Sequence, residues 1–262
     1  MELQNHYNRM WNESFPAIKT NRIECDPLLD NDNDRRFGLT LLARPPKHIC
    51  KIMVSLLDDL KLLEPEQYYY PEHDFHLTIL SIISCYTGFS AAHIYPHDYI
   101  QRIADVVADF RPIPILFSGI TASPAAVLIR GFSENATLNG LRNKLRENFR
   151  DSSLQQSIDK RYGIKTAHST VMRFRKPLQN PKLFSQKLTE LKNMEIGKFE
   201  IKELELVTND WYQRQRNTTL LHTSGYKSIP VKPFQNRLQP GHIFNDKFNA
   251  QIFGILPIHV PT

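Results

Sequence analysis

Long hydrophobic runs are missing from this 262-residue chain, and none approaches the roughly 20 residues that a bilayer-spanning helix needs. The first residues show neither the basic start nor the apolar core of a signal peptide. Cysteine is scarce: the chain has three, Cys25, Cys50 and Cys85, an odd number that cannot all pair in disulfides, and they lack the spacing of a metal site. These absences argue against membrane partners and a disulfide framework, and they predict reduced thiols in a cytoplasmic protein.

A long block of one charge is also missing, although the formal net charge is +6 and the isoelectric point is near 9.2. Lys and Arg are spread along the whole sequence. The basic balance favours an anionic partner, and a nucleotide, a phosphorylated small molecule or RNA would satisfy it equally well. With 41% apolar and 23% charged residues, the composition is that of an ordinary globular protein.

Sequence patterns divide the chain into three parts. Residues 1–35 are a polar lead-in with scattered aromatic residues, and residues 36–226 alternate between strand and helix patterns. Residues 227–262 contain five prolines and no clear period, so we interpret them as an extended arm that wraps the domain or reaches a neighbouring subunit. The oligomeric state does not follow from these patterns.

The central part predicts helices and strands in a repeated order. Apolar residues three or four positions apart predict helices at 47–63, 96–110, 136–149 and 181–191. Alternating or β-branched stretches predict strands at 37–42, 74–82, 113–121, 125–132, 166–174, 199–207 and 218–226. The order resembles an imperfect duplication, in which helices cover one side of each antiparallel sheet. We therefore predict an α+β fold of two lobes, with two antiparallel sheets facing a central cleft and helices on the outside.

Two short motifs recur in this duplicated order. His76-Leu77-Thr78-Ile79 and, ninety-two positions later, His168-Ser169-Thr170-Val171 share the pattern His-x-Thr-apolar. Because successive side chains of a strand point to opposite faces, each His and its Thr project from one face, about 7 Å apart. A pseudo-twofold arrangement of the halves would bring both tetrads to one cleft. His222-Thr223-Ser224 fits only in part, because Gly225 follows, and we assign it a structural role.

The two tetrads suit acid-base chemistry on a phosphate. An imidazole titrates near pH 6.5, so at neutral pH one ring can be neutral and its partner protonated. The neutral ring would take a proton from water and the charged ring would give one to a leaving oxygen, without a metal or other cofactor. The hydroxyls of Thr78 and Thr170 can donate hydrogen bonds to phosphate oxygens. The set favours phosphodiester hydrolysis or its reversal, and it leaves open which histidine is the base.

The paired tetrads in a duplicated α+β chain resemble the 2H phosphoesterase superfamily, which includes 2'-5' RNA ligase-like proteins and cyclic phosphodiesterases. The resemblance covers roughly residues 37–226. It implies a bilobal fold and a metal-independent phosphoric diester hydrolase, with His76, His168, Thr78 and Thr170 as catalytic residues. The implied substrate is a nucleotide or RNA with a 2',3'-cyclic, 2'-5' or related phosphodiester linkage. The resemblance does not say which linkage is used, or whether the chain hydrolyses or ligates.

Two groups of basic residues are candidates for holding the substrate. The first is the run Trp211-Tyr212-Gln213-Arg214-Gln215-Arg216, in a loop before the last predicted strand. Tyr212, Arg214 and Arg216 are selected from it to hold a base and a phosphate, although a solvated turn explains the run equally well. Arg173 and Arg175 follow the second tetrad. Regular alternation turns both away from the face of His168, unless a β-bulge intervenes.

Four other interpretations compete with the paired-histidine enzyme. In the first, each tetrad histidine is structural, as a single strand histidine commonly is. In the second, histidines bind a metal, since His73 with His76 and His93 with His97 approach metal-ligand spacing. A strand would turn the first pair to opposite faces, and Pro96 disrupts a helix across the second, so we predict no metal. A nucleotide- or RNA-binding module without turnover and an interaction protein acting through residues 227–262 are the remaining alternatives.

Overall fold

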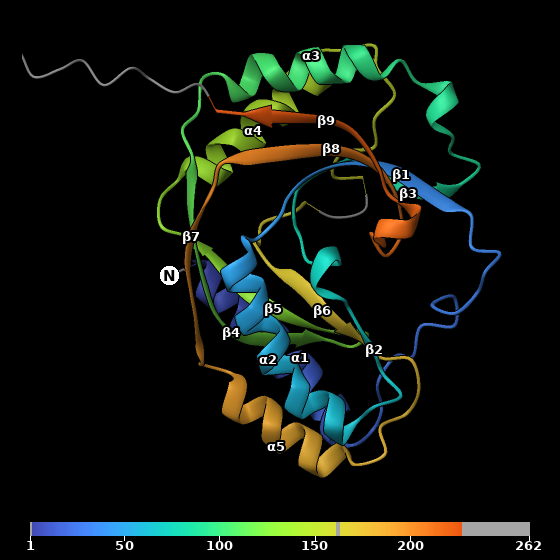
Figure 1. Cartoon of the computed structure of the whole chain (residues 1–262), viewed down its shortest axis with the longest axis vertical. Coiled ribbons are helices and arrows are strands. Elements are labelled where there is room, and N and C mark those ends of the chain that lie inside the picture. The colour runs from blue at the N-terminus through green and yellow to red at the C-terminus, as the bar shows by residue number, and fades with distance from the viewer. Residues whose placement is uncertain (1, 161–162, 227–262) are drawn as a thin grey trace, which may run out of the picture. The chain divides into compact units, whose positions relative to one another are not determined.

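The computed structural model describes residues 2–160 and 163–226, and the expected arm at 227–262 lies outside these residues. The helices and strands of Figure 1 follow one another as α1 (Glu2–Lys19), β1 (Arg36–Ala43), α2 (Lys47–Leu63), β2 (Tyr68–Tyr69), β3 (Leu77–Thr87), α3 (Pro96–Val107), β4 (Ile113–Ser123), β5 (Ala126–Ser133), α4 (Thr137–Arg150), β6 (Ser169–Arg173), α5 (Pro181–Leu191), β7 (Glu195–Ile201), β8 (Glu203–Asp210) and β9 (Thr219–Gly225). The helices predicted at 47–63 and 181–191 are confirmed to the residue. Within the described ranges, none of the helices has the length and apolar content that crossing a bilayer takes.

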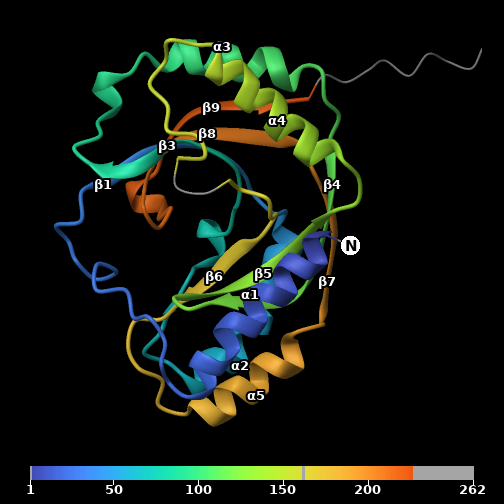
Figure 2. The same ribbon diagram turned by 180° about the vertical axis from the view of Figure 1, so that it is seen from behind.

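Two antiparallel sheets form the framework. The strand order is β3-β1-β8-β9 in the four-stranded sheet and β2-β6-β5-β4-β7 in the five-stranded sheet. Figures 1 and 2 show α3 and α4 against the four-stranded sheet, where they contact β9 and β3. The other three helices lie against the five-stranded sheet, α1 and α5 on β4 and α2 on β7. The predicted α+β fold, with two antiparallel sheets and outer helices, is confirmed.

The sheets do not correspond to the two halves of the sequence. β4 and β5 pair with the later strands β6 and β7, whereas β8 and β9 join β1 and β3. The chain passes from one sheet to the other at Lys202, so the single strand predicted over 199–207 is wrong: it joins the end of β7 to the start of β8. The local mark of this passage is a one-residue shift in apolar alternation, from Phe199 and Ile201 to Leu204 and Leu206.

The first helix, α1, was missed in the polar lead-in. Its 18 residues bury Tyr7, Trp11, Ser14 and Ile18, which recur at helical spacing along one face. The remaining residues are mainly polar, and Pro16 lies inside the helix, where proline is normally unfavourable. A narrow apolar stripe on such a segment is a weak signal, and packing against β4 stabilises the helix.

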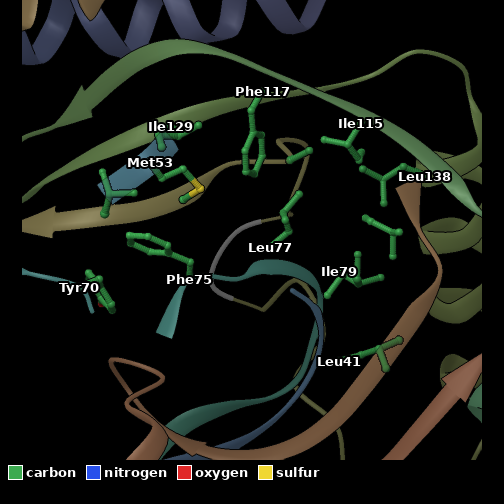
Figure 3. Close-up of a cluster of buried hydrophobic side chains, with 14 of the residues drawn as sticks. Leu41, Met53, Tyr70, Phe75, Leu77, Ile79, Ile115, Phe117, Ile129 and Leu138 are labelled. Atoms are coloured by element: carbon green, nitrogen blue, oxygen red, sulfur yellow. The ribbon is translucent and has the colours of Figure 1, made fainter. Parts of the chain in front are cut away.

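The hydrophobic core joins the two sheets. Figure 3 shows buried side chains of the four-stranded sheet (Leu41, Leu77, Ile79) with those of the five-stranded sheet (Ile115, Phe117, Ile129). Because both sheets contribute to one cluster, neither can shift without disturbing the packing of the other. The shared core therefore holds β3 and β6, the strands that begin directly after His76 and His168, at a set separation.

Candidate active site

A cavity of about 260 Å³ brings the two predicted tetrads together. His76 and Thr78 line it from the four-stranded sheet, and His168 and Thr170 line it from the five-stranded sheet. The rest of the lining is mostly polar and includes Thr40, Ser81, Ser84, Asp159, Arg173, Asn209, Trp211 and Gln213. Residues that are far apart in the sequence thus form one polar cavity between the sheets.

His76 precedes β3 by one residue and is only 9% exposed. A short 3-10 turn, Glu72–Asp74, comes before it, and the Asp74 carbonyl oxygen lies 2.8 Å from His76 Nδ1. A carbonyl oxygen can only accept a hydrogen bond, so Nδ1 donates and carries the proton. In the neutral ring, Nε2 then has no proton and is available as an acceptor.

His168 has a different partner. Its Nδ1 lies 2.6 Å from Thr166 Oγ1. A hydroxyl can donate or accept, so this contact allows a proton on Nδ1, on Nε2 or on both nitrogens. The two histidines therefore occupy the same position in their motifs, but only the contact of His76 fixes a proton on Nδ1.

Burial is the main reason why the pKa of both rings is lowered from 6.5 to about 4. For His76, the hydrogen bond with the Asp74 carbonyl opposes this lowering of the pKa, and the positive charges of Arg44 and Arg173 contribute to it. For His168, His76, Arg142, Arg173 and His6 act in the same direction. At neutral pH both rings of the free protein are neutral, which corrects the expectation that one of them is protonated.

The hydroxyl lining of β3 depends on irregular pairing with β1. Thr78, Ser81 and Ser84 all line the cavity, although side chains of a regular strand share a face only at even spacing. The register between β3 and β1 shifts at Ile79 and again at Ile82, and each shift inserts one extra residue on β3. Because of these two extra residues, side chains that are three positions apart in the sequence point to the same face, where their hydroxyl groups form a row.

A bulge in β6 also places Arg173 in the cavity. Leu128 of β5 lies opposite Thr170 and Val127 lies opposite Met172, so Val171 is the extra residue. Regular alternation turns Arg173 away from His168, and that prediction is wrong because the extra residue of the bulge reverses the side to which Arg173 points. Arg173 Nε donates to Tyr70 Oη at 2.8 Å, which holds the guanidinium beside the tetrads.

The three predicted substrate-binding residues do not line this cavity. Tyr212 is 1% exposed, donates to Asp26 Oδ2 at 2.9 Å, and lies with its ring centre 5.3 Å from the Arg173 guanidinium carbon. Arg214 stacks on Tyr212 and donates to the Leu29 carbonyl, and Arg216 is exposed. The adjacent residues Trp211 and Gln213 are the ones that line the cavity.

Two contributors, Asp74 and Thr166, are not indicated by the sequence patterns, and two others, Trp211 and Gln213, lie in the predicted loop but are not among the residues selected from it. Asp74 and Thr166 orient the histidines, and Trp211 and Gln213 line the cavity. Asp74 and Thr166 each lie two residues before a tetrad histidine, but Asp74 acts through its backbone carbonyl, which every residue type has, so only the Thr166 hydroxyl gives a signal in the sequence. Trp211 and Gln213 alternate with the predicted Tyr212 and Arg214, so the loop was found but the wrong face was chosen.

The histidines considered as metal ligands are not brought together. His73 is exposed with Nε2 3.5 Å from Asp74 Oδ1, and neither His93 nor His97 lines the cavity. In the part of the chain that the structure describes, no three His, Cys, Asp or Glu side chains are grouped so as to hold a metal ion.

No family model and no curated protein matches the chain. Among solved structures, it is similar to TT0787 of Thermus thermophilus, with a TM-score of 0.47 and 14% identity over 72% of this chain and 97% of that one. It is also similar to a protein described as a phosphoesterase (0.47, 14%, covering 74% and 99%) and to E. coli LigT complexed with 3'-AMP (0.47, 15%, covering 74% and 99%). At such identities the similarity describes the course of the backbone and nothing of the substrate.

Proposed function

We propose that the protein is a metal-independent phosphodiesterase that acts on a nucleotide or RNA with a 2',3'-cyclic, 2'-5' or related phosphodiester linkage. The observation that carries this proposal is the meeting of His76, Thr78, His168 and Thr170 in one polar cavity. Two imidazoles and two hydroxyls around one space are the groups that acid-base attack on a phosphate needs.

In this proposal His76 is the general base. Its Nδ1 proton is held by the Asp74 carbonyl, so the unprotonated Nε2 can take a proton from water. The oxygen of that water then bonds to phosphorus, while Thr78 and Thr170 donate to the non-bridging oxygens. A pKa of about 4 keeps this ring neutral across the physiological range.

His168 is the general acid. Its contact with Thr166 Oγ1 permits protonation of both nitrogens. The free ring is neutral at pH 7, but the negative charge of a bound phosphodiester favours the imidazolium form. As the bond from phosphorus to the leaving oxygen breaks, His168 gives that oxygen its proton. Arg173, held by Tyr70 at the edge of the cavity, balances the phosphate charge.

The deciding experiment is a panel of 2',3'-cyclic nucleotides and 2'-5'-linked dinucleotides, tested with the full-length protein. His76→Ala and His168→Ala should each lower kcat by about 10²–10⁴, because each removes one proton-transfer group. His222→Ala is the matched control, since His222 lies on β9, opposite Leu206, and outside the cavity lining. Activity should also survive EDTA. Full turnover in either tetrad variant, with its melting temperature unchanged, would exclude the proposal.

A binding module without turnover is the second candidate. The specific observation in its favour is that both rings are neutral in the free protein, so neither has an acidic proton ready at pH 7. It predicts that a non-hydrolysable 2',5'-dinucleotide binds while no member of the panel is turned over. Turnover of any member that is lost in His168→Ala decides for the enzyme.

A further inference from the structure

Arg142 is a buried cation on the inner face of α4. It is 1% exposed and lies in line with Leu138 and Leu145, where an apolar residue is expected. Among the described residues, no carboxylate forms an ion pair with it, and its Nη1 has no hydrogen-bond partner. Burial lowers the pKa of Arg142 to about 10, so the guanidinium is still charged at neutral pH. Asp159 interacts favourably with this charge but forms no direct ion pair with it, and a buried charge without a direct ion-pair partner is costly, which calls for a compensating role.

The hydrogen bonds of Arg142 reach the backbone of both histidine segments. Its Nη2 donates to the Thr78 carbonyl and to the Thr166 carbonyl, each at 2.8 Å. Thr78 belongs to the first tetrad, and the Thr166 hydroxyl contacts His168 Nδ1. The two segments enter different sheets, and β3 and β6 are not paired with each other. A single nitrogen atom therefore connects the two halves of the candidate active site.

The first bulge of β3 explains how the guanidinium fits. Arg142 Nε donates to the Ile79 carbonyl at 3.0 Å, next to the bond that Nη2 makes with the Thr78 carbonyl. Consecutive carbonyls of a regular strand point to opposite sides. Ile79 is the extra residue of the bulge, and this irregularity lets two consecutive carbonyls accept from one side chain. The same bulge thus helps to align the hydroxyl groups of β3 and allows the contact with Arg142.

We propose that Arg142 is a positioning residue of the proposed phosphodiesterase, whose guanidinium ties the His76 and His168 segments together across the two sheets. This inference rests on the proposed function for its effect on turnover. The planar fork of Arg supplies donors in fixed directions, and those directions set where each histidine segment lies relative to the other. The hydrogen bonds of Arg142 go to backbone carbonyls and to neither ring, so it positions the rings through the backbone that carries them.

The charge of Arg142 adds a second effect on His168. The ring of His168 is faced by four groups that are positive or become so, namely His76, Arg142, Arg173 and His6, and each disfavours its protonation. Arg142 is the one of these four that also bonds the adjacent backbone. A variant without this charge should therefore change the titration of His168 as well as its position.

The matched control is Arg130, a second buried arginine that is 4% exposed. It also donates to backbone carbonyls, those of Ser118 at 3.0 Å and Lys192 at 2.6 Å, and among the described residues its guanidinium forms no hydrogen bond with either tetrad. Arg→Lys at either position keeps the charge and removes the fork. The two variants should lose comparable thermal stability, so any difference between them reports on the site.

The first measurement compares kcat and KM of Arg142→Lys and Arg130→Lys. We expect kcat to fall about 10²-fold in Arg142→Lys with little change in KM, because a misplacement of about 1 Å is enough for such a loss. In Arg130→Lys, kcat should stay near the wild-type value. Equal losses in the two variants would overturn the proposal and leave Arg142 with a purely structural role.

The second measurement does not depend on turnover. In an NMR titration of the histidine rings, Arg142→Gln should raise the pKa of His168, and Arg130→Gln should leave it unchanged. If the pKa shifts but no phosphodiester is turned over by the wild type, the proposed function fails and the role of Arg142 stands. If turnover is found but neither kcat nor this pKa responds to Arg142, the role fails and the function stands. Should Arg142→Gln not fold, the kcat comparison of the two Lys variants decides.

Discussion

His76 and His168 occupy equivalent tetrad positions, but their Nδ1 atoms contact groups of different chemistry. The Asp74 carbonyl accepts only, whereas the Thr166 hydroxyl accepts and donates. This difference breaks the pseudo-symmetry of the two motifs at the level of single protons. It assigns the base role in our proposal to His76 and the acid role to His168.

The same two rings should make stability depend on pH. An unfolded histidine takes up a proton below about pH 6.5, whereas each folded ring does so only near pH 4. Between these values the unfolded state binds more protons, so the free energy of unfolding should fall as the pH falls from about 6.5 to 4. Each ring contributes up to about 1.4 kcal/mol per pH unit, measurable by urea denaturation at several pH values.

Replacing one ring isolates its share of this dependence. His76→Gln should make the decline between pH 6.5 and 4 shallower than in the wild type. A wild-type slope retained in His76→Gln would mean that burial does not hold this ring neutral.

At the scale of single elements, the irregularities of the strands decide which side chains meet. Bulges in β3 turn Thr78, Ser81 and Ser84 to one face, and the bulge in β6 turns Arg173 toward His168. Regular alternation predicts the two His-Thr pairs correctly because each spans only two residues. It fails for Arg173 because the bulge lies between Thr170 and that residue.

Gly131 provides a test of how closely β5 supports the second tetrad. A Cβ atom at Gly131 would lie 1.9 Å from the Ala167 carbonyl oxygen, directly before His168. Gly131→Ala should therefore displace this segment, lower kcat, and destabilise the fold by about 1–3 kcal/mol. The measurements are steady-state kinetics and urea denaturation.

Gly140 in α4 is the matched control for this substitution. A Cβ there meets Phe110 at 3.5 Å, an ordinary contact, so Gly140→Ala should stabilise the helix by about 0.5–1 kcal/mol and leave kcat unchanged. If Gly131→Ala behaved like Gly140→Ala, the approach of β5 to Ala167 would not position His168.

At the scale of the described residues as a whole, one core unites strands from early and late parts of the chain. The cluster contains Leu41 and Leu206 of the four-stranded sheet with Ile115 and Ile201 of the five-stranded sheet. Because the strands are exchanged between the halves of the sequence, neither sheet can form from one half alone. The two sheets should therefore unfold together.

The two tryptophans allow this cooperativity to be measured. Trp11 packs on Phe15 in α1, beside the five-stranded sheet, and Trp211 follows β8 of the four-stranded sheet, with the Arg36 guanidinium 4.6 Å from its ring centre. In Trp11→Phe and in Trp211→Phe, urea unfolding followed by the remaining tryptophan should coincide with unfolding followed by far-UV circular dichroism. Separate transitions in either variant would show that the sheets are independent units.

Local patterns in the sequence determined most of the elements and both tetrads. The bounds of α2 and α5 and the shared face of each His-Thr pair follow from helical and strand periodicity, which neighbouring residues set among themselves. Only the tertiary structure decided which strands share a sheet, where the bulges lie, and that Arg142 reaches both tetrads. It also decided that both histidines are neutral, because burial comes from atoms distant in the chain. These features depend on contacts between residues that are far apart in the sequence, which local patterns do not determine.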